Sequence, residues 1–336
     1  MAMITDIDLD REGKQVASLH LRHSSNESAY GAIPIPIAVV ARGSGPTVLL
    51  TAGSHGDEYE GQVVLARLMR TLEPADVTGR VIILPTLNPP AAHAGRRLSP
   101  IDGANLNRCF PGSTQAGPTS AIAHYVESVL LRRCDAWLDL HSGGTSLDTI
   151  LCVNILESAD PAVNRRSMAM ARAFGAPLIV LYDDIGGGGT SLAASRRNGV
   201  PALNTEMGGS AQLSGAGLTL CWRGVCNVLA AMGITAGPEP AAPPASRFVQ
   251  ILASSYLFAP AAGVVEHRRQ LGETVIAGEP VAWLHSLSAP ASAPRELLAG
   301  TSGMICMNRP LARTEAGDCV ALICPDVAEA SMSAWQ

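Results

Sequence analysis

Residues 46–58, PTVLLTAGSHGDE, decide the fold, because they join a buried strand to a polar turn. The apolar run from Val48 to Leu50, which ends in Ala52-Gly53, predicts a buried strand. Between Val63 and Leu72 the apolar residues fall on one stripe of a helix. A strand that leads directly into a helix is the unit from which parallel sheets covered by helices are built.

The same alternation continues along the chain. Apolar runs predict further strands at residues 80–87, 136–140, 178–182 and 201–205. Helical patterns follow residue 119, where Thr119 or Ser120 can act as the cap, and Asp160-Pro161. We therefore expect an α/β fold in which helices flank a mostly parallel or mixed sheet, preceded by an N-terminal β segment over residues 1–44.

A Pro/Ala-rich segment at residues 235–246 predicts a linker. It divides the chain into an expected catalytic domain, residues 1–240, and a β-rich domain, residues 247–336. The second domain contains a weak repeat, since residues 259–265 and 278–284 resemble residues 299–305 and 317–323. This repeat predicts a small β-sandwich. Cofactor carriers of that shape use a lysine, which the segment lacks, so we expect a structural or lid role.

Composition excludes several classes of protein. The net charge is −5, aromatic residues make up 4%, and no basic stripe is present, which argues against nucleic-acid binding. Lys14 is the one lysine, so catalysis by lysine is nearly excluded. The eight cysteines are scattered and form no C-x2-C pair, which is typical of reduced cytosolic proteins. No signal-like or membrane-spanning apolar stretch is present, so we expect a cytoplasmic protein.

Three residues predict a metal site. His55 and Glu58 are three positions apart directly after the first strand, and His141 ends the strand at 136–140. Two histidines and one glutamate leave a fourth zinc position open for water, and zinc lowers the pKa of that water toward about 7. We expect one Zn²⁺ per chain, with Asp139 orienting a ligand. Asp57 is an alternative ligand to Glu58, and an H-x-x-E pair alone is usually a surface feature.

Other polar residues predict the remaining chemistry. Glu206 ends the strand at 201–205 and is the candidate general base. Arg97 can polarise a carbonyl, while Asn107 and Arg108 can hold a carboxylate. The alternative is that Glu206 is a turn residue and that the arginines pair with surface acids such as Asp102. Thr190 follows a glycine run that lacks the phosphate-loop pattern, and we expect it to contact the substrate at the mouth of the site.

Taken together, these motifs resemble the succinylglutamate desuccinylase/aspartoacylase family, which has a zinc carboxypeptidase-like fold. The resemblance covers about residues 46–325 and rests on His55-x-x-Glu58, Asn105-Leu-Asn107-Arg108, Asp139-Leu-His141-Ser-Gly-Gly and Glu206. It implies that His55, Glu58 and His141 bind zinc and that Glu206 is the general base. It further implies that Asn107 and Arg108 hold the substrate carboxylate and that Arg97 polarises the scissile carbonyl.

The segments on either side of Asn107-Arg108, Ser99-Pro-Ile-Asp-Gly and Cys-Phe-Pro-Gly, look most like a bacterial branch of this family that acts in ectoine breakdown. The resemblance implies hydrolysis of a small N-acyl amino acid, with Nα-acetyl-L-2,4-diaminobutyrate as one expected substrate. The sequence leaves open whether the chain forms a homo-oligomer. Two alternatives stay open: a metallocarboxypeptidase that acts on peptides, and a non-catalytic binding protein of the same fold.

Overall fold

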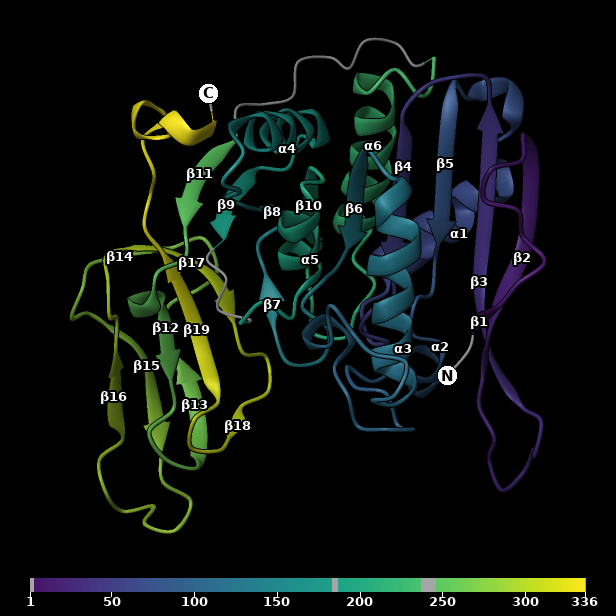
Figure 1. Ribbon diagram of the computed structural model, residues 1–336. Helices are drawn as coiled ribbons and strands as arrows, with labels where there is room; N and C mark the ends of the chain where they lie inside the picture. The colour runs from purple at the N-terminus through teal and green to yellow at the C-terminus, as the bar shows by residue number, and fades with distance from the viewer. Residues whose placement is uncertain (1–2, 183–186, 237–245, 336) are drawn as a thin grey trace.

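A computed structural model describes residues 3–182, 187–236 and 246–335 (Figure 1). Its larger unit is built on a ten-stranded sheet with the order β1-β2-β3-β5-β4-β6-β10-β8-β9-β11. In chain order these strands are β1 (Met3–Ile4), β2 (Gly13–Arg22), β3 (Ala32–Arg42), β4 (Thr47–Ala52), β5 (Gly79–Leu84), β6 (Ala136–Leu140), β8 (Cys152–Leu156), β9 (Leu178–Tyr182), β10 (Ala202–Glu206) and β11 (Arg247–Gln250).

The sheet is mixed. Strand β4 lies parallel to β5 and β6, and β10 lies parallel to β6. The N-terminal strands β2 and β3 are antiparallel, and β8 runs antiparallel to β10. Consequently the carboxyl ends of β4, β6 and β10 meet the amino end of β8 at one edge. The predicted α/β fold is confirmed, and strand β8, which the sequence patterns did not predict, completes this edge.

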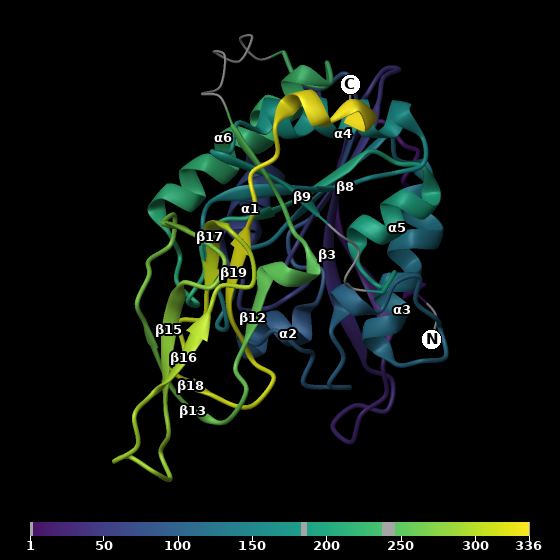
Figure 2. The same ribbon diagram turned by 90° about the vertical axis from the view of Figure 1, so that its left-hand side faces the viewer.

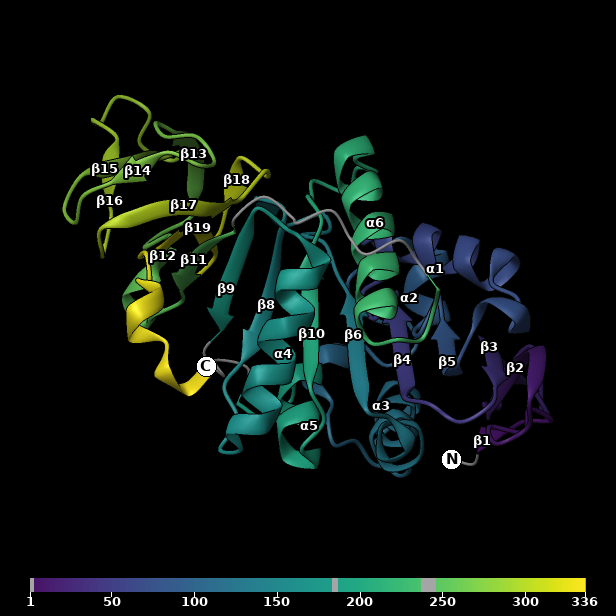
Figure 3. The ribbon, with the colours of Figure 1, turned by 90° about the horizontal axis from the view of Figure 1, so that it is seen from above.

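Helices cover both faces of the sheet (Figure 3). One face packs against α1 (Glu60–Thr71), α4 (Pro161–Phe174) and α6 (Gly215–Ala231), whose buried residues join one apolar cluster. The other face packs against α3 (Pro118–Tyr125), α5 (Ser191–Asn198) and a π-helical turn at Val126–Leu130. The remaining helical segments are α2 (Pro89–Ala94) and the 3₁₀ turns at Pro74–Asp76, Leu106–Arg108, Leu131–Arg133, Ala253–Ser255, Glu329–Ser331 and Ser333–Trp335.

Two helix starts differ from the sequence prediction. Helix α1 begins at Glu60, so residues 53–58 form a turn before the helix instead of its first turn. Helix α3 begins at Pro118 after Gly117, so the prediction that Thr119 or Ser120 caps it was wrong. Proline is favoured in the first helical position, and the Thr119 amide and hydroxyl donate to Asp102 at 2.9 and 2.8 Å.

The smaller unit contains two sheets. One has the order β12-β19-β17-β14, with β7 paired to β17, and the other has the order β16-β15-β13-β18. Apolar residues from both sheets share two buried clusters, so the sheets pack face to face. The strands are β7 (Asp148–Thr149), β12 (Tyr256–Phe258), β13 (Gly263–His267), β14 (Thr274–Val275), β15 (Pro280–His285), β16 (Arg295–Leu298), β17 (Gly303–Asn308), β18 (Arg313–Thr314) and β19 (Cys319–Cys324).

The two units are joined at several points. Strand β11 pairs with β9 in the large sheet, and β7, which leaves the large unit, pairs with β17. After β19 the chain returns over α4, where Met332 and Trp335 join the same apolar cluster as Phe174 (Figure 2). Residues 237–245 of the predicted linker lie outside the described residues. These contacts fix the smaller unit against one end of the large sheet.

Close packing between α4 and α6 yields a stability prediction. A Cβ added at Gly224 of α6 would lie 2.5 Å from ring carbons of Phe174. Overpacking of this kind costs about 1–3 kcal/mol, against a helix-propensity gain of up to about 1 kcal/mol. We expect Gly224→Ala to lower the free energy of unfolding by about 1–2 kcal/mol, measured by urea denaturation.

The control is Gly215→Ala in the same helix, where an added Cβ would meet nothing within 4 Å. This variant should leave the free energy of unfolding unchanged or raise it slightly. Equal stability of the two variants would contradict the packing argument.

Candidate metal centre and cavity

A tight turn after β4 places two of the predicted ligands. Gly53 has φ +68°, a conformation that favours glycine, and a Cβ at Gly56 would lie 2.0 Å from the backbone of Ala91. The Gly56 amide donates to the Arg96 carbonyl at 2.8 Å. The turn therefore packs directly against α2 and the chain that follows it, and it directs His55 and Glu58 into a buried edge of the sheet.

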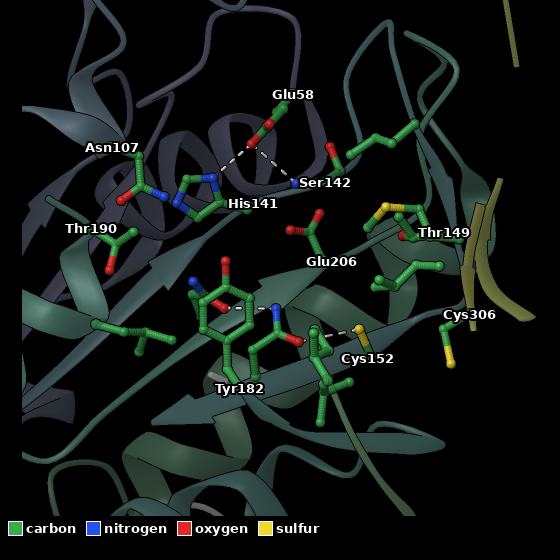
Figure 4. Close-up of a pocket in the computed structure, with 18 of the residues that line it drawn as sticks. Glu58, Asn107, His141, Ser142, Thr149, Cys152, Tyr182, Thr190, Glu206 and Cys306 are labelled. Carbon is green, nitrogen blue, oxygen red and sulfur yellow. Dashed lines mark hydrogen bonds and ion pairs between the residues drawn. The ribbon is translucent and has the colours of Figure 1, made fainter. Parts of the chain in front are cut away.

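His55, Glu58 and His141 form one cluster. Their candidate ligand atoms lie within 4.8 Å of one another, and all three residues are buried. Glu58 lies between the two rings, since Oε1 is 2.7 Å from His55 Nδ1 and Oε2 is 2.8 Å from His141 Nδ1. Figure 4 shows the contact with His141. The Ser142 amide donates to Oε2 at 3.2 Å. The chain thus brings together the three ligands that the sequence predicted.

The far nitrogen of each ring is also held. His55 Nε2 lies 2.9 Å from Asn105 Oδ1, and His141 Nε2 lies 2.8 Å from Asp139 Oδ2. Thr51 donates to Asp139 at 2.6 Å and accepts from the Trp137 indole at 2.8 Å. Such partners fix the orientation of imidazole ligands. Both Nδ1 atoms therefore face the carboxylate, and this donor set fits a zinc-type divalent cation.

Asp57, the alternative ligand, is directed elsewhere. Its Oδ2 accepts from the Thr145 amide at 2.8 Å, beside Gly144. Asp57 therefore holds the loop that follows His141. The described residues contain one group of histidine, cysteine and acidic side chains with metal-ligand spacing, and Asp57 is not in it.

Charge neighbours shift the pKa values in the cluster. Burial alone raises the pKa of Glu58, but the two histidines outweigh it and hold that pKa well below its usual range. Burial lowers the pKa of His55. Burial also acts to lower the pKa of His141, but Asp139 and Glu58 raise it well above its ordinary value. Glu58 is therefore an anion, which is the form that binds a cation.

Glu206 stands at the carboxyl end of β10 and lines the same cavity. Its Oε2 is buried and has no hydrogen-bond partner among the described residues. Burial and the nearby Glu58 carboxylate raise the pKa of Glu206 to about 8. Figure 4 shows its carboxylate in the open centre of the cavity, between His141 and Cys152. The side chain of Glu206 thus faces the cavity, in contrast to the alternative in which it belongs to a turn.

The predicted polar residues gather around the cluster. Arg97 Nη1 lies 3.4 Å from Glu58 Oε1 and 3.2 Å from His55 Nδ1. Asn107 and Arg108 lie on the 3₁₀ turn at Leu106–Arg108, and Thr190 caps α5; all three line the cavity. Asn107 Oδ1 accepts from the Ser191 amide at 2.7 Å, which ties the turn to α5. Asp102 instead accepts from the Thr119 amide and hydroxyl.

The cavity has a volume of about 200 Å³, and the smaller unit closes part of it. It is lined by all the predicted metal, catalytic and substrate-binding residues, and by others that the sequence did not indicate. From the large sheet these include Cys152, Asn154, Val180, Tyr182 and Asn204, and from the smaller unit Tyr256, Cys306, Met307, Leu322 and Cys324. Of these, Asn204 could have been found from the sequence. It is a polar residue in an apolar strand, two positions before Glu206 and hence on the same face of the sheet.

The structure thus combines an α/β sheet with a His-Glu-His cluster at its carboxyl edge, beside a cavity, and such a cluster could hold a metal ion. Residues 44–232 match the model of the succinylglutamate desuccinylase/aspartoacylase catalytic domain. The chain belongs to this family. No helix among the described residues is long and apolar enough to cross a membrane.

Individual relatives are similar over nearly the whole chain. N-alpha-acetyl-L-2,4-diaminobutyric acid deacetylase of Halomonas elongata is 38% identical over 94% of this chain and 93% of its own length. A succinylglutamate desuccinylase/aspartoacylase from Rhodobacter sphaeroides has a TM-score of 0.91 at 39% identity, covering 97% of this chain and 99% of that one. The product-bound ectoine utilization protein EutE from Ruegeria pomeroyi has a TM-score of 0.92 at 35% identity, covering 96% and 98%.

The hydrogen bond between Asp139 and His141 yields a metal-binding prediction. Because partners behind a histidine ligand typically contribute 10- to 100-fold to metal affinity, we expect Asp139→Asn to weaken zinc binding by roughly that factor. Competition with a chromophoric chelator measures the affinity. The control is Asp135→Asn on the same segment, where the carboxylate accepts from the Thr47 amide at 2.8 Å and lies outside the cluster. Equal affinities for the two variants would refute the role of Asp139.

Proposed function

We propose that the protein catalyses the zinc-dependent hydrolysis of the amide bond of a small N-acyl amino acid, and that Nα-acetyl-L-2,4-diaminobutyrate is its substrate. The observation that carries this proposal is the convergence of the His55-Glu58-His141 cluster, Glu206 and Arg97 in one enclosed cavity. The name of the Halomonas elongata relative supports the choice of substrate. One Zn²⁺ per chain would be held by His55, Glu58 and His141.

Each polar group has a part in the reaction. A bound zinc ion supplies Lewis acidity, which polarises a carbonyl and lowers the pKa of water. Glu206 accepts the proton of the attacking water and delivers it to the nitrogen as the carbon–nitrogen bond breaks. The products are a free amine and the carboxylate of the acyl group. Arg97, beside the cluster, stabilises negative charge on the carbonyl oxygen.

The remaining residues position the substrate. Arg108 can hold a carboxylate through two parallel hydrogen bonds, and Asn107 adds an amide donor from the same turn. Thr190 lies on the neighbouring helix terminus and contacts the bound molecule from that side. Because these groups surround a cavity of about 200 Å³, the site is suited to a small amino acid derivative more than to a peptide chain.

We propose that the β-rich part of the chain acts as a fixed lid. Tyr256, Cys306 and Leu322 from its five-stranded sheet line the cavity opposite the large sheet. This assigns residues 1–240 to catalysis and residues 247–336 to closure of the site, with β11 as the strand that joins them. A lid that is packed in place limits substrate length, which favours a deacylase over a carboxypeptidase.

The first test measures release of free amine from a panel of substrates by zinc-loaded protein, with and without a chelator. The panel contains Nα-acetyl-2,4-diaminobutyrate, N-acetylaspartate, succinylglutamate and a blocked dipeptide series. We expect chelator-sensitive release, fastest from Nα-acetyl-2,4-diaminobutyrate. Release from the dipeptides alone would replace the proposal with a carboxypeptidase, and no release from any compound by metal-loaded protein would refute hydrolysis.

The role of Glu206 has its own test. We expect Glu206→Gln to retain zinc but to lower kcat by about 10²–10⁴-fold, since proton transfer by a positioned side chain contributes that much. Zinc content is measured together with turnover. Loss of zinc from this variant would make Glu206 a ligand. The matched control is Glu127→Gln, a buried glutamate that pairs with Arg197 outside the cavity and whose replacement should leave kcat unchanged.

A further inference from the structure

The floor of the cavity is formed by two antiparallel strands. In the register of β10 with β8, Asn204 lies opposite Asn154 and Glu206 lies opposite Cys152. Alternate residues of a strand share a face, and directly opposed residues share it across the pair. These four side chains therefore lie on one face of the sheet, and all four line the cavity. The proton-transfer group and the two asparagines share one surface.

The two asparagines form an amide pair. Asn154 Nδ2 donates to Asn204 Oδ1 at 2.8 Å. Asn154 Oδ1 has a thiol partner, Cys152 Sγ, at the long distance of 3.8 Å. Among the residues that the structure describes, none accepts a hydrogen bond from Asn204 Nδ2. With 6% and 8% of their surfaces exposed, the two residues are buried, yet they keep one acceptor and one donor that face the cavity.

Apolar side chains line part of the same cavity as this pair. Val180, Leu192, Ile251 and Leu322 line the cavity together with the thiols of Cys152 and Cys306. Burial raises the pKa of Cys152 well above its ordinary value, so this thiol is neutral. A buried polar group in such a wall is costly unless it finds a partner. Asn204 Nδ2, and Asn154 Oδ1 with its long thiol contact, therefore match a polar group on the molecule that fills the cavity.

We propose that Asn154 and Asn204 determine specificity for the substrate's side chain. They select a short side chain that ends in a hydrogen-bond donor, such as an ammonium group, over an apolar one. The inference deepens the proposed function and rests on it. In that function the acyl carbonyl lies beside Arg97 and the α-carboxylate lies at Arg108. The part of the substrate left to contact the floor is its side chain.

Charge favours a cationic end group. The acidic group on this face of the floor is Glu206, whose carboxyl oxygens can accept a hydrogen bond, while Arg97 and Arg108 reach the cavity from the loop that follows α2. An ammonium group gains from the Asn154 carbonyl oxygen and from the nearby carboxyl group, whereas a carboxylate end gains from the Asn204 amide alone. Hydrogen-bonding sites reject analogues that lack the matching group much more strongly than apolar sites do.

The test compares Nα-acetyl-2,4-diaminobutyrate with Nα-acetyl-norvaline, in which a methyl group replaces the terminal ammonium group. We expect zinc-loaded wild-type protein to prefer the first substrate by at least about 100-fold in kcat/KM. Asn154→Leu, Asn204→Leu and the double variant should each reduce this ratio at least about tenfold, chiefly by raising KM for the diaminobutyrate compound. The double variant removes both members of the pair and so leaves no unpaired amide.

The matched control is Asn164→Leu. Asn164 is also buried, and its amide bonds to the Ser158 backbone at 2.7 and 2.9 Å, but it lies on α4 outside the cavity. Its replacement removes a buried amide and should leave the substrate ratio unchanged. An equal fall of the ratio in this variant would overturn the inference, and so would a wild-type protein that hydrolyses both substrates equally well.

Binding of the free amino acids separates this inference from the proposed function. Calorimetry with 2,4-diaminobutyrate and with norvaline measures the selectivity of the floor without turnover. Selective binding that is lost in the asparagine variants would support the role of the floor in specificity, even if no substrate is hydrolysed. Absence of hydrolysis would refute only the proposed hydrolase activity. An unchanged side-chain ratio together with a changed preference for succinyl over acetyl substrates would assign the floor to the acyl group and overturn the inference.

Discussion

Burial of the Glu58 carboxylate is the constraint on which the rest of the structure depends. With 3% of its surface exposed, this anion is stable only because two imidazoles, the Ser142 amide and Arg97 surround it. Those partners come from separate parts of the chain, so the sheet must bring the ends of β4 and β6 together. The loop that carries Glu58 also needs a glycine at position 56, because the backbone of Ala91 leaves no room for a Cβ.

Strand order converts this local requirement into a site. Because β4, β6 and β10 are adjacent and parallel, the residues at their carboxyl ends, His55 and Glu58, His141 and Glu206, share one edge. The antiparallel strand β8 then places Cys152 and Asn154 beside β10. In a fully parallel sheet, the strand next to β10 would also have its carboxyl end at this edge. The reversal instead lays the face of β8 along the cavity, where it forms a floor next to the edge that carries His141 and Glu206.

The sequence predicted the residues whose position depends on local chain geometry. His55, Glu58, His141 and Glu206 all lie at the end of an apolar strand or in the turn after it. Because strand ends of an α/β sheet meet at one edge, their meeting could be expected. The predicted start of α3 was wrong by a few residues, because the helix begins at Pro118 and not after a Thr119 or Ser120 cap. The walls of the cavity could not be predicted, since Asn154 depends on the register of β8 with β10, and Tyr256 and Cys306 depend on how the smaller unit docks.

Docking of the smaller unit and placement of the cluster are linked through one short segment. The chain that leaves His141 runs through Gly143, whose amide donates to the Gly208 carbonyl at 2.7 Å, and reaches β7, where Thr149 donates to that same carbonyl at 3.0 Å. Strand β7 then pairs with β17 of the smaller unit. The Met207 amide, next to Glu206, donates to the His141 carbonyl at 3.2 Å. The loops after β6 and β10 are therefore bonded to each other and to a sheet of the smaller unit, so that unit and the edge that carries His141 and Glu206 form one hydrogen-bonded structure.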